Sequence, residues 1–236
     1  TRPVSSAASD VYKRQCENRA LFFYMHIIHR GIVNKNYKEN CLKSFRASFK
    51  RKYGIETDIH ATKDNKFVCF HDFTLRRIFK INKSIKNINY GDLKKIKNKR
   101  FKIPLLKEVL ELSKNKFPIF IEIKPLLNKK LLSRLIDETK EFKKCIFISF
   151  KHKNIYNLLK LNSKAKVGIS FSNKDSVKSI LKYGLNKKIK YLILDKKFLS
   201  NKKVQIINKQ KYYYTIKTRK EFLKYNENNN LIFENL

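Results

Sequence analysis

The sequence predicts an α/β fold of the TIM (β/α)8 barrel class, and three observations support this prediction. Short apolar runs rich in β-branched residues alternate with stretches of helical period along most of the chain. There are eight such runs, the number of strands in a barrel of this class. The 236 residues are close to the roughly 250 that one barrel needs. An open doubly wound sheet is the alternative, but no Gly-rich phosphate loop supports it.

The strands are predicted from continuous apolar character, which is typical of parallel strands that are covered on both faces. In chain order the predicted strands are Met25–Ile28, Ile55–Ile59, Ile119–Ile123, Cys145–Phe150, Lys166–Phe171, Lys190–Leu194, Tyr212–Ile216 and Asn230–Phe233. Amphipathic stretches between them predict helices at Glu39–Lys52, Leu105–Asn115, Lys129–Glu141, Asn154–Leu161, Asp175–Tyr183, Asn201–Lys209 and Thr218–Tyr225. Each helix would cover one crossover between neighbouring strands.

Two features depart from a regular alternation. After the second strand, the pair Asp64-Asn65 favours a two-residue turn and predicts a β-hairpin insertion. A two-residue turn would place His71 opposite Asp58, and Phe73 opposite Glu56. The sequence also stops about three residues after the last predicted strand, so the last helix is predicted to be missing or vestigial.

Residues 1–24 differ in composition from the rest of the chain. They are rich in Ser, Ala and Arg, and the only methionine is Met25, at the start of the first predicted strand. We therefore predict a non-native leader over 1–24 and a single catalytic barrel domain over 25–236. No apolar run reaches the roughly 18 residues needed to span a membrane. The absence of an export signal and the wide spacing of the four cysteines favour a cytoplasmic location.

The charge of the chain is strongly positive. Lys and Arg number 56 against 19 Asp and Glu, a formal net charge of +37. Such a field attracts anions, which include nucleic acids, anionic lipid headgroups and phosphorylated small molecules. The lysines are scattered and accompany many Asn and Ile residues, a pattern more typical of compositional drift on a solvated surface. We therefore expect no nucleic-acid partner, whereas peripheral membrane contact through the basic surface is compatible with this charge.

Charged and titratable residues cluster at the ends of predicted strands, where a barrel carries its functional face. Acids inside apolar strands are costly unless they are paired or bind a metal. Carboxylate oxygens favour Mg²⁺ or Ca²⁺ over zinc, and histidines supply an acid and a base near neutral pH. The candidates are the histidines His29 and His71, the acids Glu56, Asp58 and Glu122, and the cations Arg30 and Lys124. Taken singly, each has an ordinary structural explanation, such as a salt bridge between Glu122 and Lys124.

The joint pattern resembles the glycerophosphodiester phosphodiesterase family, a group of phosphatidylinositol phospholipase C-like TIM-barrel phosphodiesterases. The resemblance rests on the order and spacing of His29-Arg30-Gly31, Glu39-Asn40, GIETDIHATKD, FHDFTLRRI, IPLLKEVL and FIEIK, from about Met25 to Lys124. It implies that His29 and His71 are the general acid and base. It also implies that Glu56, Asp58 and Glu122 hold one divalent cation, Mg²⁺ or Ca²⁺, and that Arg30 and Lys124 contact the phosphate.

The resemblance further implies a function, the hydrolysis of small-molecule glycerophosphodiesters to sn-glycerol 3-phosphate and an alcohol. Tyr214, Lys217 and the C-terminal LIFENL depart from the family pattern and bear on the leaving alcohol. One alternative is a lysophospholipase D or phospholipase C-like enzyme acting on membrane lipids, which an apolar rim at the barrel mouth would favour. Two others are a basic nucleic-acid-binding protein and a degenerate barrel without turnover.

Overall fold

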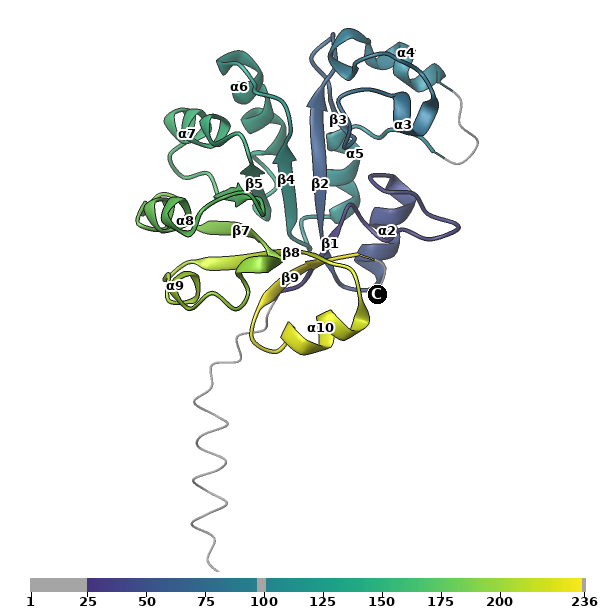
Figure 1. Cartoon of the computed structure of the whole chain (residues 1–236). Helices are drawn as coiled ribbons and strands as arrows, with labels where there is room; N and C mark the ends of the chain where they lie inside the picture. The colour runs from purple at the N-terminus through teal and green to yellow at the C-terminus, as the bar shows by residue number, and fades with distance from the viewer. Residues whose placement is uncertain (1–24, 97–100, 235–236) are drawn as a thin grey trace, which may run out of the picture.

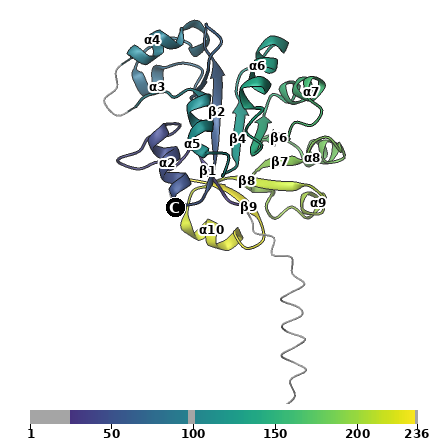
Figure 2. The ribbon, with the colours of Figure 1, turned by 180° about the vertical axis from the view of Figure 1, so that it is seen from behind.

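The computed structural model describes residues 25–96 and 101–234, which form a closed ring of parallel strands with helices outside it (Figures 1 and 2). Parallel pairing of β1 with both β2 and β9 closes the ring. This arrangement confirms the predicted TIM barrel. The eight parallel strands are β1 (Ile27–His29), β2 (Gly54–Ala61), β4 (Ile119–Ile123), β5 (Cys145–Ser149), β6 (Val167–Phe171), β7 (Tyr191–Asp195), β8 (Gln210–Ile216) and β9 (Asn230–Phe233).

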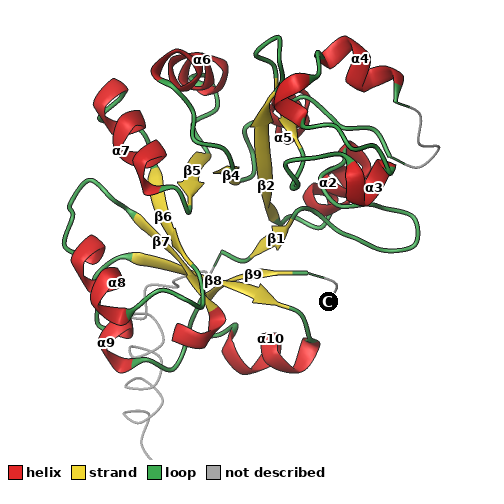
Figure 3. Ribbon diagram, turned by 45° about the horizontal axis from the view of Figure 1, so that its top comes forward, coloured by secondary structure: helices red, strands yellow, loops and turns green. Residues whose placement is uncertain are grey.

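The helices surround the ring (Figure 3). Several begin at a side-chain cap of the expected type, because Asn128, Ser176, Asn201 and Thr218 each accept a hydrogen bond from a backbone N–H in the first turn. The helices that cover the barrel are α2 (Leu42–Lys50), α5 (Leu106–Ser113), α6 (Lys129–Thr139), α7 (His152–Leu161), α8 (Val177–Gly184), α9 (Lys202–Gln205) and α10 (Arg219–Tyr225), with a short 3₁₀ helix η2 (Lys196–Phe198) before α9.

Side chains alternate along each strand between the helices and the barrel interior. In β4, Ile119, Ile121 and Ile123 pack outward against the helices, whereas Phe120 points inward. The interior is filled toward the amino ends of the strands by large side chains, namely Ile27, Phe120, Ile146, Ile148, Ile193, Tyr212 and Ile232. The next inward position on β4 is Glu122, so the apolar filling gives way to charged groups toward the carboxyl ends of the strands.

The segment between β2 and α5 is the insertion that the sequence predicted, and it contains more structure than a hairpin. Strand β3 (Phe67–Cys69) pairs antiparallel with β2 and is followed by α3 (Arg76–Phe79), η1 (Ile85–Asn87) and α4 (Tyr90–Lys95). These helices were not predicted, and α3 and α4 lie to the side of the carboxyl half of β2 (Figure 1). They enclose a second apolar cluster of their own, which includes Phe70, Leu75, Ile85, Leu93 and Phe101.

The predicted register of the hairpin was wrong by one residue. The structure pairs Ile59 with Cys69 and Ala61 with Phe67, so the connecting loop has three unpaired central residues, 63–65, in place of two. The reason is Asn65, whose φ of 58° puts it in the left-handed region at the end of a three-residue loop. Phe70, rather than His71, therefore lies opposite Asp58 and donates its N–H to the Asp58 carbonyl. Phe73 does not face Glu56 and packs instead against the ring of His60.

Two predictions concern the ends of the chain. The proposed leader, 1–24, lies outside the described residues, and the description ends at Glu234, directly after β9. The absence of a final helix therefore stays a prediction. Within residues 25–96 and 101–234, no helix combines the length and the apolar character needed to cross a bilayer.

Candidate active site

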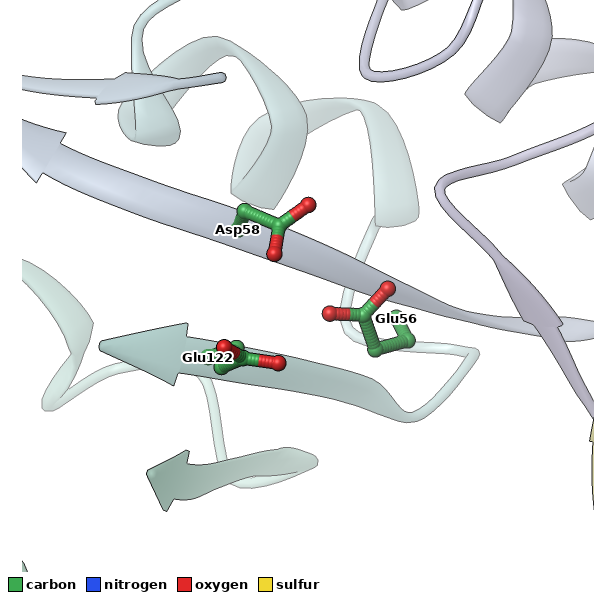
Figure 4. Close-up of side chains that lie close together, drawn as sticks. All are labelled: Glu56, Asp58 and Glu122. Carbon is green, nitrogen blue, oxygen red and sulfur yellow. The ribbon is translucent and has the colours of Figure 1, made fainter. Parts of the chain in front are cut away.

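Strand register brings the three predicted acids together. Glu56 and Asp58 are two residues apart on β2 and share its inward face, and Asp58 is the direct partner of Glu122 across the β2–β4 pair. One carboxylate oxygen from each of the three acids lies within 4.8 Å of the others (Figure 4). Glu122 is distant in sequence from Glu56 and Asp58 but adjacent to them in space, as the sequence predicted.

The three acids differ in charge state because their neighbours differ. Burial raises the pKa of Glu56 far above its usual range, and the nearby carboxylates of Asp58 and Glu122 raise it further. Burial also raises the pKa of Glu122, to about 7. Burial acts in the same direction on Asp58, but Arg30 and Lys124 outweigh it and hold the pKa of Asp58 below its usual range. Asp58 is therefore the acid most firmly ionised in the cluster.

Two cations border the cluster. Arg30 Nε lies 3.1 Å from Asp58 Oδ2, and Lys124 Nζ lies 2.7 Å from Glu122 Oε1 and 3.3 Å from Asp58 Oδ1. Asp58 is also held by Asn40, whose side-chain amide donates to Asp58 Oδ2 at 3.0 Å. Thr57 in turn donates its hydroxyl to Asn40 Oδ1 at 2.7 Å, which fixes the orientation of the amide. The salt bridge between Glu122 and Lys124 thus exists within a larger charged cluster.

The donor set of the cluster fits a hard divalent cation. Glu56 Oε1 and Asp58 Oδ1 are buried and lack a hydrogen-bond partner, although Lys124 lies near the latter at an angle unsuited to a hydrogen bond. Buried carboxylate oxygens without partners are unfavourable unless a cation compensates them. All three candidate ligands offer oxygen, which suits hard cations. The residues that could hold a metal are therefore Glu56, Asp58 and Glu122.

His29 reaches the cluster from the end of β1 and is oriented by an acid that the sequence reasoning missed. Its Nδ1 lies 2.9 Å from Glu234 Oε2, and its Nε2 lies 3.8 Å from Glu56 Oε2. The hydrogen bond to His29 lowers the pKa of Glu234, so this carboxylate stays ionised. A carboxylate that accepts from Nδ1–H leaves Nε2 as the nitrogen that can accept a proton. Glu234 follows β9 directly, and an acid at the carboxyl end of the last strand was the signal available in LIFENL.

His71 is positioned by the loop after β3 and by a chain of ion pairs. Its Nδ1 lies 2.7 Å from Asp72 Oδ1, which is the same arrangement as for His29. Burial lowers the pKa of His71, although the charge of Asp58 opposes this effect. Arg77 donates from Nε to Asp72 Oδ2 at 2.6 Å and also contacts Glu39, which pairs with Arg30. A continuous set of charges thus connects the two loops that carry the histidines.

The predicted residues line one cavity of about 220 Å³ at the carboxyl ends of the strands. Its charged lining comprises His29, Arg30, Glu56, His71, Glu122 and Lys124, so six of the seven predicted site residues meet there. The seventh, Asp58, is buried behind them and in contact with Arg30 and Lys124. The rest of the lining is more apolar and consists of Ile148, Phe150, Ile193, Tyr214, Thr215 and Ile232. The cavity therefore combines charged side chains with apolar ones, and Ile148, Ile193 and Ile232 among the latter belong to the barrel interior.

Gly31 shapes the turn that carries His29 and Arg30. Its φ is +75°, and a Cβ built on it would lie 2.5 Å from Ser44 Oγ and 2.9 Å from Phe45 Cδ1. We expect Gly31→Ala to lower the free energy of unfolding by about 2–4 kcal/mol, because it adds both backbone strain and a clash. Urea unfolding measures this change. Gly91→Ala is the matched control, since a Cβ there meets nothing within 4 Å, and an equal loss in both variants would contradict the account.

The sequence of the chain is similar to those of a known family and of several known proteins. The profile of the Glycerophosphoryl diester phosphodiesterase family matches residues 29–225. A glycerophosphodiester phosphodiesterase of Caldanaerobacter subterraneus subsp. tengcongensis is 31% identical over 160 residues, which cover 61% of this chain and 65% of that protein. A lysophospholipase D of Homo sapiens is 33% identical over 132 residues, 50% of this chain and 41% of that protein. The chain thus spans less than two thirds of the length of these relatives.

Solved structures share the fold of the chain. A glycerophosphodiester phosphodiesterase from Thermotoga maritima superposes with a TM-score of 0.74 at 23% identity, covering 89% of this chain and 93% of that one. A phosphodiesterase of Oleispira antarctica, solved in complex with its product sn-glycerol-3-phosphate, superposes with a TM-score of 0.76 at 21% identity, covering 90% and 93% of the two chains. At these identities the similarity supports the barrel fold alone.

Proposed function

Because the chain belongs to the glycerophosphoryl diester phosphodiesterase family, we propose that it hydrolyses glycerophosphodiesters to sn-glycerol 3-phosphate and an alcohol. The observation that carries the proposal is the cluster of Glu56, Asp58 and Glu122 in a cavity that two histidines also line. Two buried acids and a third that is partly exposed, gathered around one point, suit a divalent cation, and oxygen ligands alone favour Mg²⁺ or Ca²⁺. When bound there, the cation would polarise the phosphoryl group and offset its developing charge.

The two histidines divide the proton transfers between them. Each has Nδ1 paired with a carboxylate, Glu234 for His29 and Asp72 for His71, which leaves Nε2 to exchange protons in the cavity. One imidazole accepts the proton of the attacking hydroxyl, which belongs either to water or to the glycerol beside the phosphate. Attack by the glycerol hydroxyl would release the alcohol and form a cyclic phosphate, which water would then open to glycerol 3-phosphate. The other donates a proton to the leaving alkoxide. The carboxylate paired with each ring stabilises that ring while it is protonated.

Arg30 and Lys124 bind the phosphate through fixed positive charge. Both line the cavity, and the acids beside them raise their pKa values although burial acts in the opposite direction, so both stay protonated. Arg30 is held by ion pairs with Asp58 and Glu39, and Lys124 is held by Asp58 and Glu122. Both cations are therefore in position at the cavity before a phosphate group arrives. Preorganised charge of this kind stabilises a transition state without reorganisation during the reaction.

Hydrolysis of glycerophosphocholine tests the proposal. We expect release of glycerol 3-phosphate in the presence of Mg²⁺ or Ca²⁺, and loss of that release when EDTA removes the cation, because the three acids repel one another without it. Adding excess cation back should restore the rate. Turnover that continues undiminished in EDTA would reject the metal-dependent reaction, and the absence of turnover with either cation would reject the substrate.

A second candidate substrate is a lysophospholipid, because apolar side chains border the cavity. Phe150 is among the residues that line it, and Phe73 and Leu126 lie exposed on neighbouring loops. Such a surface could contact the acyl chain of a lipid whose headgroup diester enters the cavity. Comparison of kcat/KM for lysophosphatidylcholine and glycerophosphocholine decides between the two candidates. A higher value for the lysophospholipid would assign the chain a lysophospholipase D activity.

Arg77 is proposed as a positioning residue, since it reaches His71 only through Asp72. We expect Arg77→Ala to lower kcat by about tenfold, with little change in KM, because Asp72 loses the partner that orients it. The pH profile of kcat should also shift, which a purely structural role would not produce. The neighbouring exposed Arg76→Ala serves as the control. Equal kinetic losses in the two variants would contradict this role for Arg77.

A further inference from the structure

We propose that the mouth of the barrel contacts an anionic phospholipid surface through Phe73, Leu126 and Phe150, a set called here the apolar arc. Each side chain sits on a loop at the carboxyl end of the barrel, after β3, β4 and β5 respectively. Strands β2, β4 and β5 are consecutive in the ring, and β3 is paired to β2, so the arc occupies one continuous part of the mouth. The inference rests on the proposed function only in treating the adjoining cavity as the active site.

The apolar arc is exposed although its members are large. Phe73 is 51% exposed, Leu126 is 53% exposed and Phe150 is 40% exposed. Within the described residues, Phe73 and Phe150 are the only phenylalanines among the large apolar side chains that are this exposed. Aromatic and aliphatic side chains in such positions are typical of contacts with the interface of a bilayer. Three of them along one edge of the barrel mouth form an apolar surface, which indicates a contact site more strongly than single exposed residues do.

The arc is held in place rather than carried on unsupported loops. Asn154 at the start of α7 donates to the Pro125 carbonyl at 2.9 Å and accepts from Leu127 N–H at 3.0 Å, which fixes the loop that presents Leu126. Phe150 packs edge-on against Tyr214 with ring centroids 5.8 Å apart. Phe73 packs edge-on against His60 at 4.9 Å. A preorganised apolar surface binds with less loss of conformational entropy.

The charge beside the arc matches an anionic surface. The segments 73–76, 126–130 and 150–153 contain five Lys or Arg and no Asp or Glu. These basic residues are all exposed, and they are Arg76, Lys129, Lys130, Lys151 and Lys153. Each basic residue near an anionic bilayer contributes about 1 kcal/mol of attraction. A nucleic acid would use the same charges, but an exposed aliphatic side chain such as Leu126 offers it neither a charge nor a stacking face.

The apolar arc adjoins the proposed active site. Phe150 belongs both to the arc and to the lining of the cavity that contains His29 and His71. A bilayer touching the arc therefore lies directly at the opening of the proposed active site. Under the proposed function, lipid-derived diesters would enter from that surface, and Arg30 and Lys124 in the cavity lining would receive their phosphate groups.

Co-sedimentation of the full chain with lipid vesicles tests the inference. The vesicles contain phosphatidylcholine alone or phosphatidylcholine with phosphatidylglycerol, and the buffer contains EDTA so that no turnover is needed. We expect binding to the anionic vesicles only, weakened about fivefold each by Phe73→Ser and Leu126→Ser. The matched controls are Leu185→Ser and Ile206→Ser, which replace side chains that are 85% and 81% exposed after α8 and α9, at the opposite end of the barrel.

Each outcome decides for or against the arc. Loss in the two arc variants with unchanged controls supports it, and equal loss in all four variants overturns it. Failure of the unaltered chain to sediment with anionic vesicles also overturns it. Sedimentation that is abolished at about 1 M salt and is indifferent to Leu126 would assign binding to charge alone, and competition by a single-stranded oligonucleotide would then identify a nucleic-acid surface. Hydrolysis of glycerophosphocholine in solution is measured separately, so an inactive chain that still binds vesicles rejects only the proposed function.

Discussion

Replacing either histidine of the cavity should lower kcat for glycerophosphocholine hydrolysis by about 10²–10⁴-fold, the range typical of a lost general acid or base. The substitutions are His29→Ala and His71→Ala. The reason is geometric, since both rings line the same cavity and each has its Nδ1 held by a carboxylate. KM should change far less than kcat, because Arg30 and Lys124 remain to bind the phosphate.

A double variant and a control at a histidine outside the cavity test this prediction further. If the two imidazoles act in one reaction, His29→Ala combined with His71→Ala should cost far less than the product of the two single effects. His152→Asn is the control, since that ring packs against Phe171 and Tyr183 and hydrogen-bonds the Ser170 carbonyl. Full activity in both single variants would show that the histidines have no part in the chemistry.

Glu122→Gln should lower the cation-dependent kcat by about 10³-fold or more. The same substitution should make the cation-free protein more stable. The activity falls because one of three oxygen ligands loses its charge. The stability changes because burial and the charge of Asp58 raise the pKa of Glu122 from its usual range to about 7. An acid whose folded pKa is raised loses stability as pH rises from its unfolded value, near 4.5, through about 7.

The gain in the cation-free Glu122→Gln protein should therefore be absent below about pH 4.5 and reach on the order of 1–3 kcal/mol above pH 7. Denaturant unfolding in EDTA at several pH values measures it. Glu111→Gln is the matched control, since Glu111 is an exposed acid on α5 far from the cluster. A Glu122→Gln protein that is less stable than the unaltered chain at pH 8 would contradict this prediction. It would show that neighbouring side chains stabilise the ionised Glu122 carboxylate even when no cation is bound.

Much of the barrel could be predicted from the sequence because parallel strands are buried on both faces. The strands Ile119–Ile123 and Asn230–Phe233 have the predicted bounds, and the other predicted strands differ by a few residues at their ends. The insertion was predicted only as a hairpin. The short helices α3 and α4 show no clear helical periodicity of apolar residues in the sequence. They are stabilised by packing against the local cluster around Phe70 and Leu75.

The hairpin register shows where local rules are insufficient. Asp64-Asn65 favours a two-residue turn, but the left-handed conformation of Asn65 extends the loop by one residue. A slip of one residue reverses the face of every side chain in a paired strand. His71 reaches the cavity all the same because the pairing ends at Cys69 and the following loop sets its position.

The acids were the most predictable part of the site, and their partners were the least. Glu56, Asp58 and Glu122 are conspicuous because charge is rare in an apolar strand, and parallel pairing brings strand ends together. Glu234 contacts His29 and Arg77 contacts Asp72, and both contacts depend on side-chain positions across the barrel mouth. The acid directly after the last strand was a signal for Glu234, whereas no spacing in the sequence indicates the contact between Arg77 and Asp72.

The most direct test of the account is the stoichiometry of cation binding by calorimetry, with Mg²⁺ or Ca²⁺ titrated into the cation-free chain. We expect one site per chain that is lost in Glu56→Gln and in Glu122→Gln and retained in Glu111→Gln. Binding that persists unchanged when Glu56 and Glu122 are both replaced would contradict it, because the acids of β2 and β4 could then not be the groups that hold the ion.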